Sequence, residues 1–249
     1  MEQKIKGILF DLGDTLLNFG RVDVRSLFEA GAQLAYRYLA SLDQPLPSFE
    51  KFHRRQNWAI RWSYLKSRLT RREFNSLDVL GRLGVGMGHD LNVAQTAELA
   101  WLWYEPLSRC ATVEDGARQM LVRFRDRGLT LGVVSNTFLP GEVLDRHLAN
   151  EGMLDLLPVR VYSCDVRYRK PHRNIFQAAL ELANLPADRT IFVGDSLHAD
   201  INGANRAGMI SVLKDPADRH ANARIQPRHR IKRLVDLPSI VDRYDAGQA

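Results

Sequence analysis

The chain of 249 residues has no long apolar run and few cysteines. No stretch approaches about 18 consecutive apolar residues, so nothing predicts a membrane-spanning helix. The first apolar stretch is four residues long and ends in an acid, which is too short for a secretory signal. The two cysteines, Cys110 and Cys164, do not form a C-x-x-C pair. This usage is typical of a reducing compartment, so we expect a cytoplasmic protein whose cysteines form no disulfide and bind no metal.

Signatures of nucleic-acid binding are also missing. The net charge is +6, which favours anionic partners in general. Eight Lys or Arg and no acid lie within residues 51–72, and a second basic region covers residues 219–233. Neither region carries zinc-ligand spacing, an aromatic RNA-binding motif or a helix-turn-helix pattern. We therefore expect the basic side chains of both regions to face water. The expected partner is a small anionic substrate, and neither a nucleic acid nor a membrane. The protein is expected to be a monomer or a homodimer.

Short apolar runs are present, each followed at once by polar residues and a helical pattern. Their apolarity is continuous rather than alternating, which predicts strands that are buried on both faces of a parallel sheet. Apolar residues at steps of three and four predict helices between them. The alternation predicts an α/β fold with a doubly wound parallel sheet. The expected strands are residues 5–10, 129–134, 190–193 and 210–213, with 159–162 as a weaker fifth.

Residues 19–108 interrupt this alternation. They contain no convincing strand, but they contain apolar stripes at helical spacing and all four tryptophans. We expect residues 1–18 and 109–249 to form the core, and residues 19–108 to form an inserted all-helical domain. Within it, Trp58 and Trp62 are expected to pack helices together while the nearby arginines face water. The alternative is that arginines face the core and the two rings stack on a ligand.

Polar side chains follow the predicted strands at the points where they end. Asp11 follows the first strand, Ser135 and Asn136 follow residues 129–134, and Asp195 follows residues 190–193. Ligands of open α/β sheets bind beyond the carboxyl ends of the strands, so these side chains are expected to meet. Lys170 precedes a proline at a predicted helix start and is expected to join them.

This set of residue types suits a phosphoryl group and a metal ion. Clustered carboxylates repel each other, and Mg²⁺ relieves the repulsion while binding phosphate oxygens. Asp11 and Asp195 are the natural metal pair. Ser135, the backbone around Asn136 and Lys170 supply hydrogen-bond donors and positive charge for a phosphoryl group. A carboxylate in such a site can act as the nucleophile through an aspartyl-phosphate.

The segments FDLGDTL, SNT, RKP and VGDSLHADINGANRAGM resemble, in this order, the four motifs of the haloacid dehalogenase superfamily. The helical insertion resembles a cap placed between the first and second motifs. The resemblance implies a Rossmann-like core, a cap that closes over the site and selects substrate, and hydrolase activity. It also implies that Asp11 is the nucleophile and that Asp11, Asp195 and the backbone carbonyl of Gly13 bind Mg²⁺.

The same resemblance assigns the remaining polar residues of the motifs. Ser135 would bind the phosphoryl group. Lys170 would screen the charges of the nucleophile and the phosphate, and Asp200 would orient the site.

The sequence departs from the superfamily's phosphatases at Gly13, where they usually carry a second Asp. That acid protonates the leaving alcohol and then activates water, and such catalysis contributes roughly 10²- to 10⁴-fold. We expect the neighbouring Asp14, with Thr15, to stabilise the turn. The alternative is that Asp14 replaces the missing acid.

These residues predict a Mg²⁺-dependent phosphatase of small phosphorylated metabolites. Without the second acid it would be slow or restricted to good leaving groups, such as those of sugar 1-phosphates or acyl phosphates. One alternative is a dehalogenase or a phosphonate hydrolase of the same superfamily. Another is a catalytically weak protein that binds a phosphorylated ligand.

Overall fold

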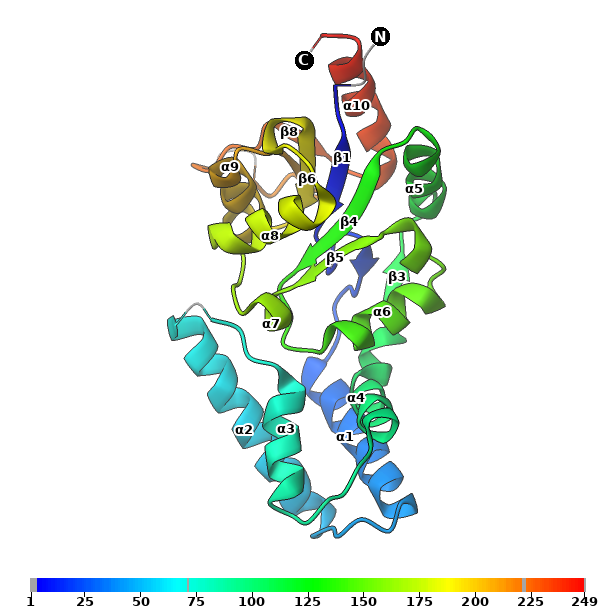
Figure 1. The fold of residues 1–249 in the computed structure, drawn as a ribbon, viewed down its shortest axis with the longest axis vertical. Helices are drawn as coiled ribbons and strands as arrows, with labels where there is room; N and C mark the ends of the chain where they lie inside the picture. Colours follow the sequence, from blue (N-terminus) through cyan, green and yellow to red (C-terminus); the bar gives the residue numbers. More distant parts are fainter. Residues whose placement is uncertain (1–3, 71, 221–222, 249) are drawn as a thin grey trace.

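The computed structural model describes residues 4–70, 72–220 and 223–248, and a parallel sheet forms its upper part in Figure 1. All neighbouring strands of the six-stranded sheet run parallel, in the order β5-β4-β1-β6-β7-β8. All five expected strands are therefore confirmed. The strands are β1 (Gly7–Phe10), β4 (Thr130–Ser135), β5 (Val159–Tyr162), β6 (Thr190–Gly194), β7 (Ile210–Lys214) and β8 (His229–Ile231).

Helices cover both faces of the sheet, as the continuous apolar runs predict. Successive strand residues point to opposite faces, so Ile8 and Phe10 belong to one hydrophobic cluster and Leu9 to another. The first cluster includes α5 (Ala117–Asp126), α6 (Gly141–Asn150) and α10 (Leu237–Asp245). The second includes α8 (Arg173–Ala183) and α9 (Asn202–Ala207). The doubly wound α/β core is confirmed.

Shorter helical elements connect these layers. The four-residue helix α7 (Ser163–Val166) follows β5, and a π-helical turn (Leu197–Ile201) follows β6. The 3₁₀ turns are Leu154–Leu156, Ala187–Arg189 and Leu234–Asp236.

The second basic region is not simply a solvated tail. Its residues His229–Ile231 form β8, which extends the sheet beside β7 and buries Ile231. The neighbouring Arg230 is exposed, so the strand covers one apolar side chain while its charges face water. Three residues are too few to produce a recognisable period, which explains why the sequence pattern missed this strand.

A bundle of four helices lies at the end of the molecule away from both termini (Figure 1). It consists of α1 (Val24–Ser41), α2 (Phe49–Thr70), α3 (Ser76–Val85) and α4 (Val93–Ser108). The chain enters and leaves it through two paired antiparallel segments, β2 (Leu17–Asn18) and β3 (Thr112–Val113). None of the helices in the described residues is long and apolar enough to cross a membrane.

Local sequence explains how the bundle forms. Asp23 caps α1 by accepting hydrogen bonds from the backbone N–H groups of Arg25 and Ser26. Gly31 allows α1 to approach α4 closely, because a Cβ there would lie 2.2 Å from the carbonyl oxygen of Trp103.

The expectation that Trp58 and Trp62 pack the helices together is wrong. They are 70% and 60% exposed, and their rings stack on each other with centroids 6.2 Å apart. The buried face of α2 instead carries Phe52, Gln56 and Ser67. Helical spacing identifies residues that share a face, but it does not say which face meets the neighbouring helices.

A buried Tyr–His pair joins the helical bundle to the sheet-containing part. Tyr104 of α4 and His147 of α6 are 2% and 1% exposed. The Tyr104 hydroxyl and His147 Nδ1 are 2.8 Å apart and share a hydrogen bond. Burial lowers the pKa of His147 from 6.5 to about 4. The imidazole is therefore neutral in the folded protein at neutral pH.

This burial predicts acid-sensitive stability. Because the pKa of His147 is lower in the folded than in the unfolded chain, its contribution is complete above pH 6.5 and declines as the pH falls towards 4. Protonation of His147 is expected to lower the free energy of unfolding by up to about 3 kcal/mol over that pH range. Urea unfolding at several pH values should show a shallower acid loss for His147→Gln than for the parent. The exposed His198→Gln is the control and should keep the parent's slope; equal slopes for all three would contradict the prediction.

Candidate active site

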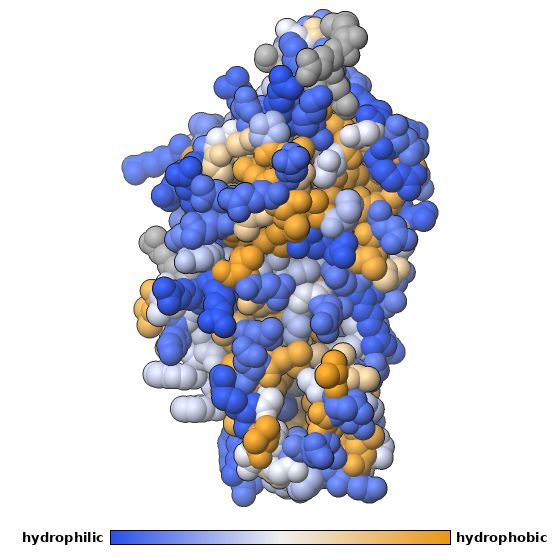
Figure 2. All heavy atoms as spheres, in the orientation of Figure 1, coloured by the Kyte–Doolittle hydropathy of each residue, from blue (hydrophilic) through white to orange (hydrophobic). Residues whose placement is uncertain are grey.

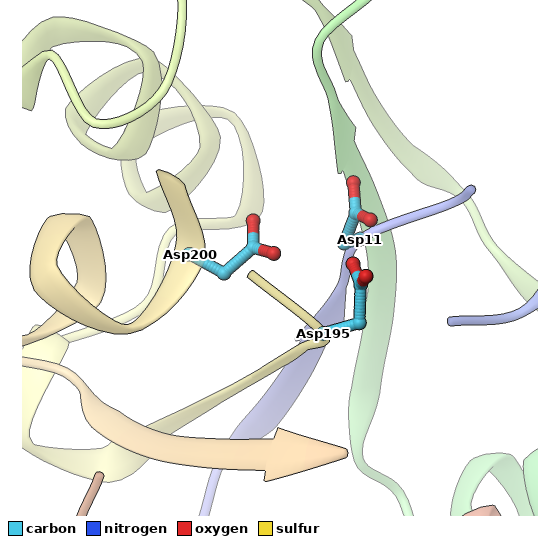
Figure 3. Close-up of side chains that lie close together, drawn as sticks. All are labelled: Asp11, Asp195 and Asp200. Carbon is cyan, nitrogen blue, oxygen red and sulfur yellow. The ribbon is translucent and has the colours of Figure 1, made fainter. Parts of the chain in front are cut away.

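Three carboxylates converge at the carboxyl edge of the sheet (Figure 3). Asp11 follows β1, Asp195 follows the adjacent β6, and Asp200 lies in the π-helical turn after β6. The N–H of Asp11 donates to the carbonyl of Val193, which fixes the two strand ends side by side. One oxygen from each carboxylate lies within 4.8 Å of the others. The structure therefore brings together residues that are 189 positions apart in the chain.

Lys170 lies among these acids, with only 5% of its surface exposed. Its Nζ is 2.5 Å from Asp11 Oδ1 and 2.7 Å from Asp200 Oδ1, and it donates to the carbonyl of Val134 at 2.8 Å. The side chain of Asn136 holds the lysine's backbone: its Oδ1 accepts from Lys170 N, and its Nδ2 donates to Lys170 O. Lys170 is thus held at both ends, through its ammonium group and through its backbone N–H and carbonyl.

The electrostatics of the cluster follow from burial. Burial is the largest influence on Asp11 and, with the nearby acids, raises its pKa to about 7 although Lys170 lowers it. Burial and the charges of Asp200 and Asp14 raise the pKa of Asp195 to about 6. Burial disfavours the charged form of Lys170, but Asp11 and Asp200 raise its pKa, so it remains an ammonium. The site holds more negative than positive charge when all its acids are ionised.

The donor set suits a divalent cation. Carboxylate oxygens are the ligands that Mg²⁺ prefers, and this cluster presents three within reach of one another. The buried Asp200 Oδ1 contacts Lys170 Nζ as an ion pair but has no aligned hydrogen bond within the described residues. An additional positive charge would relieve the repulsion among these carboxylates.

Ser135 and Gly194 complete the floor of the site. Ser135 ends β4 next to β1, and its hydroxyl makes no hydrogen bond to any part of the chain that the structure describes. It is therefore available to a ligand. Gly194 ends β6, where a Cβ would lie 2.4 Å from Asp200 Cγ. Only glycine leaves room for the Asp200 carboxylate at this position.

The loop after β1 contains Gly13, Asp14 and Thr15, and their contacts differ. Asp14 adopts a left-handed conformation with φ of 57°, and its carboxylate accepts from the N–H of Phe19 at 3.3 Å. Buried Thr15 places its hydroxyl 3.5 Å from Asp11 Oδ2. Gly13 has no positive φ, and a Cβ there would meet nothing closer than Phe19, at 3.9 Å. Neither the backbone nor packing requires glycine at this position.

Lys214 is a buried residue that the sequence analysis did not identify. It lies at the end of β7 and donates to the carbonyl of Thr15 at 2.9 Å, which braces the loop that carries Asp11. Glu114 lies 3.4 Å from its ammonium. The signal was present in the sequence, because Lys214 follows an apolar strand run just as Asp11 and Asp195 do.

Glu73 is a second buried residue that was missed, and it ties the helical bundle to the site. It follows α2 and accepts hydrogen bonds from Ser67, from Ser163 and from Arg169, the residue before Lys170. Its N–H donates to the carbonyl of Arg167. No local pattern marks this glutamate, since three of its partners, Ser163, Arg167 and Arg169, are distant in the sequence.

Comparisons with known proteins identify the superfamily. A family model for haloacid dehalogenase-like hydrolases matches residues 5–208. A glyceraldehyde 3-phosphate phosphatase from Pyrococcus furiosus is 28% identical over 219 residues, which cover 84% of this chain and 80% of that protein. A ribulose-1,5-bisphosphate 5-phosphatase from Halopiger xanaduensis is 30% identical over 56% of this chain and 60% of its own length. A glyceraldehyde 3-phosphate phosphatase from Pyrococcus abyssi matches over 40% of its length, at 35% identity.

Solved structures agree with the family match. A crystal structure of a HAD phosphatase from Thermococcus onnurineus aligns with a TM-score of 0.59 and 26% identity over 95% of this chain and 98% of that one. A 2-haloacid dehalogenase from Pseudomonas syringae, with a TM-score of 0.63 and 23% identity over 96% of this chain and 99% of that one, shares the fold. With the family model covering most of its length, the chain belongs to the haloacid dehalogenase-like hydrolases.

Proposed function

We propose that this hydrolase is a Mg²⁺-dependent phosphatase of small phosphorylated metabolites that acts through an aspartyl-phosphate on Asp11. The observation that carries the proposal is the buried Asp11, held by Lys170 at 2.5 Å beside Asp195 and Asp200. The phosphatase names of several relatives support the same reaction class. The cysteine usage and small anionic substrate are consistent with a cytoplasmic enzyme.

The first chemical step is attack on phosphorus. An oxygen of ionised Asp11 forms the new P–O bond as the bond to the leaving oxygen breaks. Lys170 favours the ionised nucleophile and offers positive charge to the phosphoryl oxygens, while the free hydroxyl of Ser135 donates a hydrogen bond. The side chain of Asn136 is occupied by the backbone of Lys170, so its backbone N–H is the group assigned to phosphate.

A metal ion completes the proposed site. Asp11, Asp195 and the Gly13 carbonyl would hold Mg²⁺, and Asp200 would orient Lys170 beside them. The bound ion supplies charge neutralisation for the phosphoryl group and its surroundings. Asp200 also accepts from the N–H of Ser196, so this second contact fixes its position.

In the second step water attacks the phosphorus of the aspartyl-phosphate, the bond between phosphorus and the Asp11 oxygen breaks, and phosphate leaves with Asp11 restored as a carboxylate. Gly13 supplies no acid for the leaving oxygen and no base for this water. Asp14 directs its carboxylate to the backbone of its own loop, which favours its role in the turn. We therefore propose turnover that is slow or limited to leaving groups that need little protonation, such as those of acyl phosphates and sugar 1-phosphates.

Two other readings are less well supported by the site. Dehalogenation requires no metal, and a second carboxylate beside Asp11, that of Asp195, would then have no cation to bind. A protein that only binds phosphorylated ligands would not require a carboxylate in contact with Lys170 at the point of attack. The carboxylate cluster thus favours a metal-assisted reaction at phosphorus over dehalogenation and over ligand binding alone.

Replacing the nucleophile tests the proposed reaction. Asp11→Asn should lower phosphate release by at least about 100-fold, because an amide cannot form the intermediate. Phosphate release is measured with Mg²⁺ on a panel that includes acyl phosphates and sugar 1-phosphates. Asp14→Asn is the matched control: its amide oxygen can still accept from Phe19 N, so most activity should remain. Unchanged activity in Asp11→Asn, or no activity in the parent on any substrate, would refute the proposed function.

Gly13→Asp tests the explanation for slow turnover. The space at Gly13 accepts a side chain, so we expect hydrolysis of simple alkyl phosphates to rise by roughly 10²- to 10⁴-fold, with a smaller gain for acyl phosphates. Gly13→Asn has a similar shape but no titratable acid, and it should give no such rise. A folded Gly13→Asp variant with parental activity on alkyl phosphates would show that the missing acid does not limit turnover.

A further inference from the structure

A large cavity opens beside Lys170, between the C-terminal half of α2 and the sheet-containing part. Its volume is about 740 Å³, and Lys170 and Asn136 form part of its wall. Strongly hydrophilic residues, in dark blue, gather where this end of α2 faces α8 and α9 (Figure 2). No Asp or Glu lines the cavity among the residues described. Its wall carries the cationic or titratable side chains of Arg68, Arg169, Arg173, Arg206, His172 and His198.

Two of the cations in the wall already have partners. Arg169 is paired with the buried carboxylate of Glu73, and Lys170 with Asp11 and Asp200. Their charges are therefore largely balanced by the protein itself.

Three arginines in the wall remain unbalanced. Arg68, Arg173 and Arg206 have no ion pair with any residue in the described parts of the chain, and all three are exposed. They come from separate elements: α2, the first residue of α8, and α9. Like charges that face one cavity repel each other, and an anionic ligand removes that repulsion. The guanidinium group also matches phosphate and carboxylate oxygens in bidentate geometry.

We propose that the substrate carries a second anionic group, a phosphate or a carboxylate, which Arg68, Arg173 and Arg206 recognise. This inference rests on the proposed phosphatase function, because the transferred phosphoryl group is placed at Asp11 and Lys170. The second anion then occupies the cavity beyond Lys170. Arg68 belongs to the helical bundle while Arg173 and Arg206 belong to the sheet-containing part, so such a ligand contacts both.

The rest of the basic stretch on α2 does not share this role. Arg54 and Arg55 line a different cavity, beside Trp58 and Met87. Arg61 is exposed and lines neither cavity. Arg71 lies outside the described residues. Only the part of α2 near the site contributes to the proposed recognition, which makes Arg61 a matched control on the same helix.

The test compares two ligands with one carbon skeleton, propane-1,3-diol monophosphate and propane-1,3-diol bisphosphate. Calorimetry on Asp11→Asn with Mg²⁺ measures binding without turnover. We expect the bisphosphate to bind at least about tenfold more tightly. Adding Arg68→Gln and Arg206→Gln should remove most of this preference while monophosphate affinity stays the same. Adding Arg61→Gln instead should leave the preference intact.

Equal affinity for the two ligands, or a loss of affinity for both when Arg68 and Arg206 are replaced, would overturn the inference. If Asp11→Asn does not fold, competitive inhibition of acetyl phosphate hydrolysis by the two ligands in otherwise unmodified protein, with and without the arginine changes, decides the same question. The outcomes separate the two proposals. Equal affinity for both ligands in a protein that hydrolyses acyl phosphates retains the phosphatase and rejects the anion subsite. Selective binding of the bisphosphate by a protein that releases no phosphate from acyl phosphates or sugar 1-phosphates rejects the phosphatase.

Discussion

The site depends on one buried ammonium group, that of Lys170. It lies within hydrogen-bonding distance of Asp11 and within ion-pair distance of Asp200, with little access to water. Removing one partner from a buried ion cluster leaves the others uncompensated and typically costs about 3–5 kcal/mol. The same contact lowers the pKa of Asp11 against the larger effect of burial, and so favours the ionised carboxylate at the mouth of β1. Both the packing of these buried acids and the proposed reaction therefore require the positive charge of Lys170.

Much of the surrounding structure keeps this group in place. The carboxamide of Asn136 bonds to both backbone polar groups of Lys170, and Gly194 leaves the space that Asp200 fills. Lys214 braces the loop after β1 through the carbonyl of Thr15. Beyond these, Glu73 reaches from the end of α2 to Arg169, adjacent to the lysine. Through that contact the helical bundle is connected to the residue next to the site's central charge.

Local patterns predicted the sheet and most of the site, because parallel strands place their carboxyl ends at one edge. Asp11, Lys170, Asp195 and Asp200 were all expected there, and the structure brings them together. Properties that depend on distant partners were not predictable in this way. Local spacing does not encode which elements pack together. It therefore could not predict that Trp58 and Trp62 are exposed, that Glu73 bonds to Ser163 and Arg169, or that the short strand β8 forms. Only the structure shows that a side chain would fit at Gly13. The sequence does not say whether the backbone conformation or the packing at a position requires glycine.

In the proposed reaction Asp11 carries the phosphoryl group, and no neighbouring acid helps to release it. An enzyme without that acid also lacks the base for the hydrolytic water, so the intermediate should accumulate. The most direct measurement is rapid acid quenching during turnover of ³²P-labelled acetyl phosphate with Mg²⁺, followed by peptide mapping. We predict label on the peptide that contains Asp11, in an early burst that approaches one phosphoryl group per chain. Label on another residue, or phosphate release with no labelled protein at any time, would contradict the account.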